Sequence, residues 1–98
     1  MTTDVFVIAQ SPVARFKAFE IVDEIRRNRI RALCNLNDRS MKAQMREANR
    51  LEAKFVYIIG ETELAEGAGS LKDMQSGEQN KISFDRIVEE IRNRLPIS

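Results

Sequence analysis

The residues best suited to chemistry in this sequence are basic, and they are concentrated in one segment. From Arg26 to Lys54, nine lysines and arginines face three acidic residues, giving a net charge of +6, whereas the whole chain carries only +1. On a helical wheel, Lys42, Arg46 and Arg50 fall within one arc of about 100°. Guanidinium and ammonium groups on one helix face bind anions such as phosphate. Charge alone favours the other interpretation, a solvated helix surface.

The sequence lacks the residues of the common catalytic sites. It contains no histidine, which removes the usual general base and the commonest metal ligand. Its one cysteine, Cys34, lies in a predicted buried strand and is interpreted as a structural thiol. Neither a GxxxxGK[ST] loop nor a GxGxxG loop occurs. We therefore expect no catalytic, cofactor-binding or metal site, and a small enzyme built on Glu61, Glu63 and Asp73 is the weakest alternative.

The composition predicts a single folded domain. The 98 residues are 43% hydrophobic, which is enough for one core. No apolar run approaches the length of about 18 residues that a membrane span needs, and the start has no signal-peptide pattern. A cytoplasmic location and no membrane partner are therefore expected.

The hydrophobic pattern predicts alternating strands and helices, which must position the basic segment. Strands are expected at 4–9, 31–36, 54–59, 70–74 and 79–83. Helices are expected at 12–28, 41–51 and 84–95, each after a serine cap, with a short helical turn at 61–67. The order β-α-β-α-β-β-β-α predicts an α/β domain over residues 1–98, with a five-stranded mixed sheet flanked by three helices.

Longer motifs carry a family resemblance over nearly the whole chain. The stretch "DRSMKAQMREANRLEAKFVYIIGETELAEG", followed by "LKDMQSGEQ", closely resembles the C-terminal anticodon-binding domain of histidyl-tRNA synthetase, a class IIa aminoacyl-tRNA synthetase. The resemblance begins at "DVFVIA" and ends with "FDRIVEEIRNRL". The matching positions, in order, are Arg39-Ser40, Lys42, Gln44, Ala48, Gly60-Glu61, Glu63-Leu64, Gly67, Lys72-Asp73 and Gly77-Glu78-Gln79.

Two turn positions depart from that family. It often has glycine before the second strand and before the Arg-Ser pair, where this chain has Asn28-Arg29 and Asp38. Asparagine and aspartate tolerate left-handed backbone better than most residues, so we expect the fold to be kept. Arg29 adds a charge that is expected to change the local contact with RNA.

The resemblance implies that the domain binds the anticodon stem and loop of a histidine-specific tRNA. Charging of that tRNA would need ATP and magnesium in a separate catalytic domain of the parent enzyme, which is expected to be a homodimer. This chain would carry no catalytic site of its own. The alternative is a synthetase-derived regulatory or protein-interaction module without a role in aminoacylation.

The start of the second helix is the first candidate tRNA contact. Lys42, Arg46 and Arg50 are the candidates for holding phosphates, and plain solvated side chains are the alternative for Arg46 and Arg50. Ser40 with the free N–H groups of the helix start makes a favourable anion site. Arg39 is a further candidate. Its structural alternative is an ion pair with Asp38 or Glu63.

Two residues further along the chain are the candidates for reading bases. The family places polar anticodon-reading residues in and after the "GETELAEG" turn, which selects Glu63 and Lys72. Glu63 has an alternative role as the cap of its own turn. Gln44 is also a tRNA-contact candidate, but it lies near the apolar stripe of its helix and could instead satisfy a buried backbone group.

Overall fold

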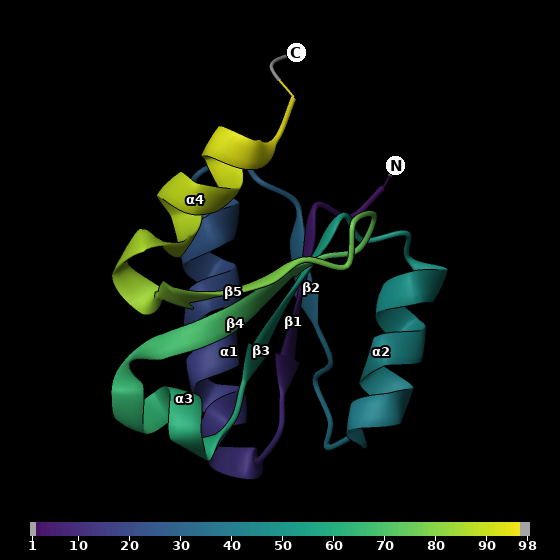
Figure 1. Ribbon diagram of the computed structural model, residues 1–98. Coiled ribbons are helices and arrows are strands. Elements are labelled where there is room, and N and C mark those ends of the chain that lie inside the picture. Colours follow the sequence, from purple (N-terminus) through teal and green to yellow (C-terminus); the bar gives the residue numbers. More distant parts are fainter. Residues whose placement is uncertain (1, 97–98) are drawn as a thin grey trace.

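The computed structural model describes residues 2–96, which form one sheet with helices on both faces (Figure 1). The strands are β1 (Val5–Ala9), β2 (Ala32–Cys34), β3 (Phe55–Ile59), β4 (Ala68–Asp73) and β5 (Gln79–Ser83). The helices are α1 (Pro12–Arg27), α2 (Met41–Arg50), α3 (Glu61–Glu66) and α4 (Ile87–Arg94), the last preceded by a 3-10 turn, η1 (Phe84–Arg86). In this part of the chain no helix is both long and apolar enough to cross a membrane.

The strand order is β2-β1-β3-β4-β5, and the sheet is mixed as predicted. β1 pairs in parallel with both β2 and β3, whereas β4 pairs antiparallel with β3 and β5. The chain runs from β1 outward to β2 and then returns across β1 to β3. Such a reversal leaves a crevice at the carboxyl ends of the parallel strands, where open α/β sheets commonly bind ligands.

Side-chain alternation along the strands builds two separate cores. Val5, Val7 and Tyr57 face α1 and α4, and Phe6 and Val56 face α2. α2 lies over β1 and leaves the same side of β4 and β5 uncovered, as Figure 1 shows. The sheet is therefore fully covered on one face and half covered on the other.

The helical turn predicted at 61–67 is present as a six-residue helix, α3, and Gly67 closes it as predicted, in left-handed conformation with φ of 73°. Three other predicted element boundaries were wrong. β4 begins at Ala68, two residues before the predicted start, and β2 is limited to three residues because its pairing with β1 ends at Cys34. Ser83 makes no side-chain cap, since a 3-10 turn follows it and α4 begins only at Ile87.

The ends of α1 and α2 place unexpected residues in left-handed backbone. Arg29 has φ of 65° and Glu52 has φ of 54°, whereas Asn28 has φ of −97°. At the end of α1, the N–H of Arg29 donates to Arg26 (3.0 Å) and that of Ile30 to Ile25 (3.3 Å). This is a Schellman motif, whose left-handed residue is the second after the helix, so the expected role of Asn28 falls to Arg29.

Candidate nucleic-acid interface

The carboxyl ends of β1 and β3 meet the starts of α2 and α3 at one end of the sheet, which we call the strand-end edge. This edge is at the bottom of Figure 1. The backbone N–H of Gln10 donates to the carbonyl of Ile59 at 2.8 Å, which joins the two strand ends. Ser40 caps α2 as predicted, because its hydroxyl accepts the N–H of Ala43 at 3.0 Å. The two sequence segments that carry the candidate residues are thus brought to one place.

Gln44 has a structural role in this edge. Its side chain is 3% exposed. Its Nε2 donates to the carbonyls of Ala9 (2.8 Å) and Arg39 (2.9 Å), and its Oε1 accepts the N–H of Ala9 (3.2 Å). The side chain thereby fastens α2 to the end of β1. These bonds support the structural alternative for Gln44, since no polar group of its amide faces the surface.

Glu63 caps its own helix, which was the structural alternative for this residue. Its Oε1 accepts the N–H of Gly60 at 2.7 Å. The other carboxylate oxygen makes no hydrogen bond within residues 2–96 and remains available on this half-buried side chain. A Cβ at Gly60 would lie 2.2 Å from Oε1 of Gln10 and 2.8 Å from Oε1 of Glu63, so a larger residue here would displace these two side-chain ends. The cap and a contact through the second oxygen are compatible.

The exposed side of α2 carries cations without carboxylate partners. Arg39, Lys42 and Arg46 are exposed, and none forms an ion pair in the part of the chain that the structure describes. The alternative of an ion pair between Arg39 and Asp38 or Glu63 was wrong. Asp38 pairs with Arg15 at 2.7 Å, and Glu63 forms no ion pair within residues 2–96.

Arg50 differs from those three residues because it has a partner. Its Nε lies 3.0 Å from Oε1 of Glu47, and a second nitrogen binds the other oxygen. This contact lowers the pKa of Glu47 and raises the pKa of Arg50. The first half of α2 is therefore the part with unneutralised positive charge.

Lys72 lies on the same side of the sheet as α2 but not at the strand-end edge. It pairs with Val56 on β3, whose side chain faces α2. Val56 precedes Ile59 by three residues, which is about 10 Å along a strand. The structure thus places Lys72 on the α2 side of the sheet, at least three residues before the strand end from which α3 and Glu63 follow.

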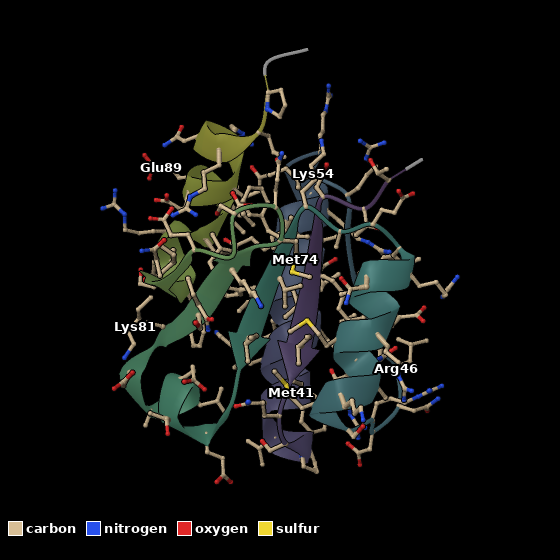
Figure 2. All side chains as sticks on the ribbon, turned by 45° about the vertical axis from the view of Figure 1, so that its right-hand side comes forward. Met41, Arg46, Lys54, Met74, Lys81 and Glu89 are labelled. Atoms are coloured by element: carbon tan, nitrogen blue, oxygen red, sulfur yellow. The ribbon has the colours of Figure 1, made fainter. Side chains whose placement is uncertain are left out.

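The uncovered side of β4 and β5, together with a strip of methionines, forms a surface that sequence reasoning missed. Alternation places Ser70, Gln79 and Lys81 on the same side as Lys72. Between these strands and α2, methionines pack on the second core, and Figure 2 shows Met41 and Met74 in this strip. We call this surface the open face; it consists of Met41, Met45, Ser70, Lys72, Met74, Gln79 and Lys81. The polar alternation in "SLKD" and "QNKIS" was the available signal.

The three carboxylates considered for catalysis, Glu61, Glu63 and Asp73, do not lie close together. Asp73 accepts the N–H groups of Gln75 (2.8 Å) and Ser76 (3.1 Å) at the far end of β4 from α3, so it is remote from Glu61 and Glu63. Among residues 2–96 no cluster of three His, Cys, Asp or Glu is arranged to hold a metal.

Cys34 is half-buried at the end of β2. Burial raises the pKa of its thiol, and the nearby Arg26 guanidinium opposes that rise only in part. A thiol with a raised pKa is a poor nucleophile at neutral pH. The structure therefore favours the structural interpretation of this cysteine.

Comparison with known proteins gives consistent matches. A family model described as "Anticodon binding domain" matches residues 4–94. The histidine–tRNA ligase of Lysinibacillus sphaericus is 44% identical over 85 residues, which cover 87% of this chain and 20% of that protein. That of Chloroherpeton thalassium is 49% identical over 78 residues, covering 80% and 18%.

A solved structure agrees with these sequence matches. The crystal structure of apo histidyl-tRNA synthetase from S. aureus superposes with a TM-score of 0.87 at 33% identity, covering 93% of this chain and 23% of that one. The chain spans about a fifth of the length of the curated relatives it matches.

Proposed function

The chain belongs to the anticodon-binding domain family, and from that premise we propose that it binds the anticodon stem and loop of a histidine-specific tRNA. The observation that carries this proposal is the row of unpaired cations, Arg39, Lys42 and Arg46, beside the edge where β1 and β3 end. Uncompensated positive charge on one helix suits a polyanion, whereas solvated helix faces usually intersperse both signs.

Phosphate binding falls to the first half of α2. Lys42 and Arg46 lie one helical turn apart on the exposed side, so they can contact neighbouring phosphates of one strand. Ser40 occupies one of the N–H groups at the helix start, which leaves others for an anionic oxygen. Arg39 extends the same row outward.

Base recognition falls to the open face and to Glu63. Single-stranded loop bases are read by hydrogen bonds to their edges and by contact with their flat sides. Lys72 supplies donors, and the second carboxylate oxygen of Glu63, in the helix that follows the end of β3, supplies an acceptor. Met41 and Met74 offer an adaptable apolar surface for the flat sides of bases.

The chemistry of tRNA charging is assigned to another part of the parent enzyme. We expect ATP and magnesium to be bound in a catalytic domain, and the parent synthetase to act as a homodimer. The relatives of which this chain spans about a fifth are named histidine–tRNA ligases. In this proposal the present domain contributes affinity and selectivity for the tRNA.

Titration with RNA hairpins tests the proposal. The cognate stem-loop and a hairpin with the same stem but changed anticodon bases are each titrated at two salt concentrations. We expect tighter binding of the cognate hairpin. The salt slope, which is the slope of the logarithm of the binding constant against the logarithm of the salt concentration, should fall in magnitude by about 0.7–0.9 when Lys42 or Arg46 is changed to alanine. Lys17→Ala, on the α1 side over Phe84, is the matched control and should change neither. Equal binding of both hairpins, even at low salt, would contradict the proposal.

A second function, a protein-interaction module, is favoured by one observation on α1. Val13 and Phe16 are 62% and 69% exposed on a helix that covers the opposite side of the sheet from α2. Salt-sensitive RNA binding without anticodon preference, together with loss of a protein contact in Phe16→Ser, would support this second function over the first.

A further inference from the structure

A group of arginines surrounds a surface pocket at the other end of the sheet. The pocket has a volume of about 460 Å³ and lies where α1 ends and β2 begins. Lys54, which pairs with the same carboxylate as the lining residue Arg31, marks this region in Figure 2, at the opposite end from Met41. The lining residues are Thr2, Thr3, Arg26, Arg29, Ile30, Arg31, Ala32 and Leu33.

Three of the lining side chains are arginines, and none is a carboxylate. Arg26 is held in place because its Nε donates to the carbonyl of Ala32 at 2.8 Å, which leaves its terminal nitrogens free to bind a ligand. Arg31 lies 3.5 Å from Asp4, but that buried carboxylate also lies 3.7 Å from Lys54. One acid shared by two cations leaves the pocket with surplus positive charge.

Arg29 is the most informative of the three arginines. It has φ of 65°, a conformation that costs a bulky residue free energy and that glycine adopts freely. Its side chain is exposed and makes no ion pair within the described residues, so its charge is available to a ligand.

We propose that this arginine pocket binds a phosphate of an RNA backbone, as a second anchoring point remote from the anticodon-reading surface. Guanidinium groups bind phosphate oxygens through paired hydrogen bonds, and the hydroxyl of Thr2 adds a further donor. The identity of the ligand as RNA rests on the proposed function. β1 is only about 16 Å long, so one folded RNA can contact both ends of the sheet.

Arg29→Gly tests the pocket without damaging the fold, because glycine fits the left-handed backbone better than arginine does. The probes are a full-length transcript of histidine-specific tRNA and the same transcript with changed anticodon bases. We expect Arg29→Gly to weaken binding of both about five- to eightfold at 0.1 M salt and to lower the salt slope by about 0.7–0.9. The ratio between the two affinities should not change, and the melting temperature should be equal or higher.

Two matched variants locate the effect. Arg27→Gln removes the same charge two residues away, from a side chain that pairs with Asp23 and does not line the pocket, and should leave affinity and slope nearly unchanged. Arg29→Lys keeps the charge and should recover most of the affinity. The amide resonances of Thr3 and Arg31 should shift when the transcript is added to the unaltered chain.

The outcomes separate this inference from the proposed function. Unchanged affinity and slope in Arg29→Gly, or equal losses in Arg27→Gln, would overturn the arginine pocket whatever the anticodon preference. If the unaltered chain binds both transcripts equally but Arg29→Gly still lowers the slope, the pocket stands and anticodon recognition fails.

Discussion

Tyr57 on β3 lies directly over Gly69 on the neighbouring strand β4. The Tyr57 hydroxyl accepts the N–H of Gly69 at 3.0 Å and donates to the carbonyl of Ile82 on β5 at 2.6 Å. A Cβ on Gly69 would come within 2.6 Å of the tyrosine ring. One phenol therefore joins three strands behind the open face, and the absence of a side chain on Gly69 permits it.

Gly69→Ala should destabilise the domain by about 1–3 kcal/mol, because the ring of Tyr57 is enclosed and cannot move away from an added methyl group. Chemical denaturation measures the free energy of unfolding. Gly77→Ala is a useful comparison, since nothing lies within 4 Å of its Cβ position and only its backbone φ of 80° is unfavourable. An unchanged unfolding midpoint in Gly69→Ala would show that the sheet tolerates the contact.

Alkaline pH should weaken the fold through Tyr57. Burial raises the pKa of Tyr57 from 10.0 to about 12. Below pH 10 the phenol is protonated in both folded and unfolded chains, so stability is unaffected there. Between pH 10 and pH 12 the unfolded chain loses the proton first, which lowers the free energy of unfolding by up to roughly 3 kcal/mol.

The single tyrosine of the chain makes this titration directly observable. Phenolate absorbance of the folded domain should appear with a midpoint near 12, and Tyr57→Phe should lose the corresponding part of the pH dependence of stability. Tyr57→Phe itself should cost about 1–3 kcal/mol at neutral pH, because the N–H of Gly69 loses its partner. A phenolate midpoint at 10 in the folded domain would contradict the burial argument.

Glu52→Gly should stabilise the domain by about 0.5–1 kcal/mol. Glu52 follows α2 with φ of 54°, and the N–H of Ala53 donates to Ala48 at 3.0 Å, so the position is the left-handed residue of a helix end. Thermal unfolding compares it with Glu52→Ala, which removes the same charge but keeps a Cβ and should give no gain. Equal effects of glycine and alanine would assign the change to charge.

Glu63→Gln should separate the two roles of this residue. Glutamine keeps an oxygen for the N–H of Gly60, so the stability should change by about 0.5 kcal/mol or less. The loss of the carboxylate should lower the preference for the cognate anticodon hairpin. Glu63→Ala should lose both stability and preference, and a full cognate preference in Glu63→Gln would leave Glu63 with the capping role only.

Gln44→Ala should cost about 1–3 kcal/mol of stability, because the backbone groups of Ala9 lose their partners. The folded fraction should keep its preference for the cognate hairpin. Denaturation and hairpin titration on the same sample give both quantities. A selective loss of cognate binding at unchanged stability would return Gln44 to the list of RNA contacts.

Patterns local in the sequence predicted most of the fold. The continuous apolar runs of β1 and β3 and the serine caps at Ser11 and Ser40 depend on neighbours only; both strands are buried and both caps are present. The partner of Gln44 is 35 residues away, so sequence spacing alone left its role open. The open face likewise required the register that pairs Lys72 with Val56, which no local pattern specifies.

The sequence also failed to predict which residue after α1 takes the left-handed backbone conformation. Residue preference favoured Asn28, but the last hydrogen bonds of α1 determine which residue turns, and they select Arg29. A small shift in where a helix ends outweighs the preference of one residue for a backbone conformation.

The preference for the cognate anticodon, and its dependence on Lys72, is the most direct test of the account. The ratio of dissociation constants for the cognate hairpin and for the hairpin with changed anticodon bases is measured for the unaltered chain, Lys72→Ala and Lys17→Ala. We expect a clear preference in the unaltered chain and in Lys17→Ala, reduced by about 1–3 kcal/mol in Lys72→Ala. The same ratio in all three proteins would contradict the assignment of base reading to the open face.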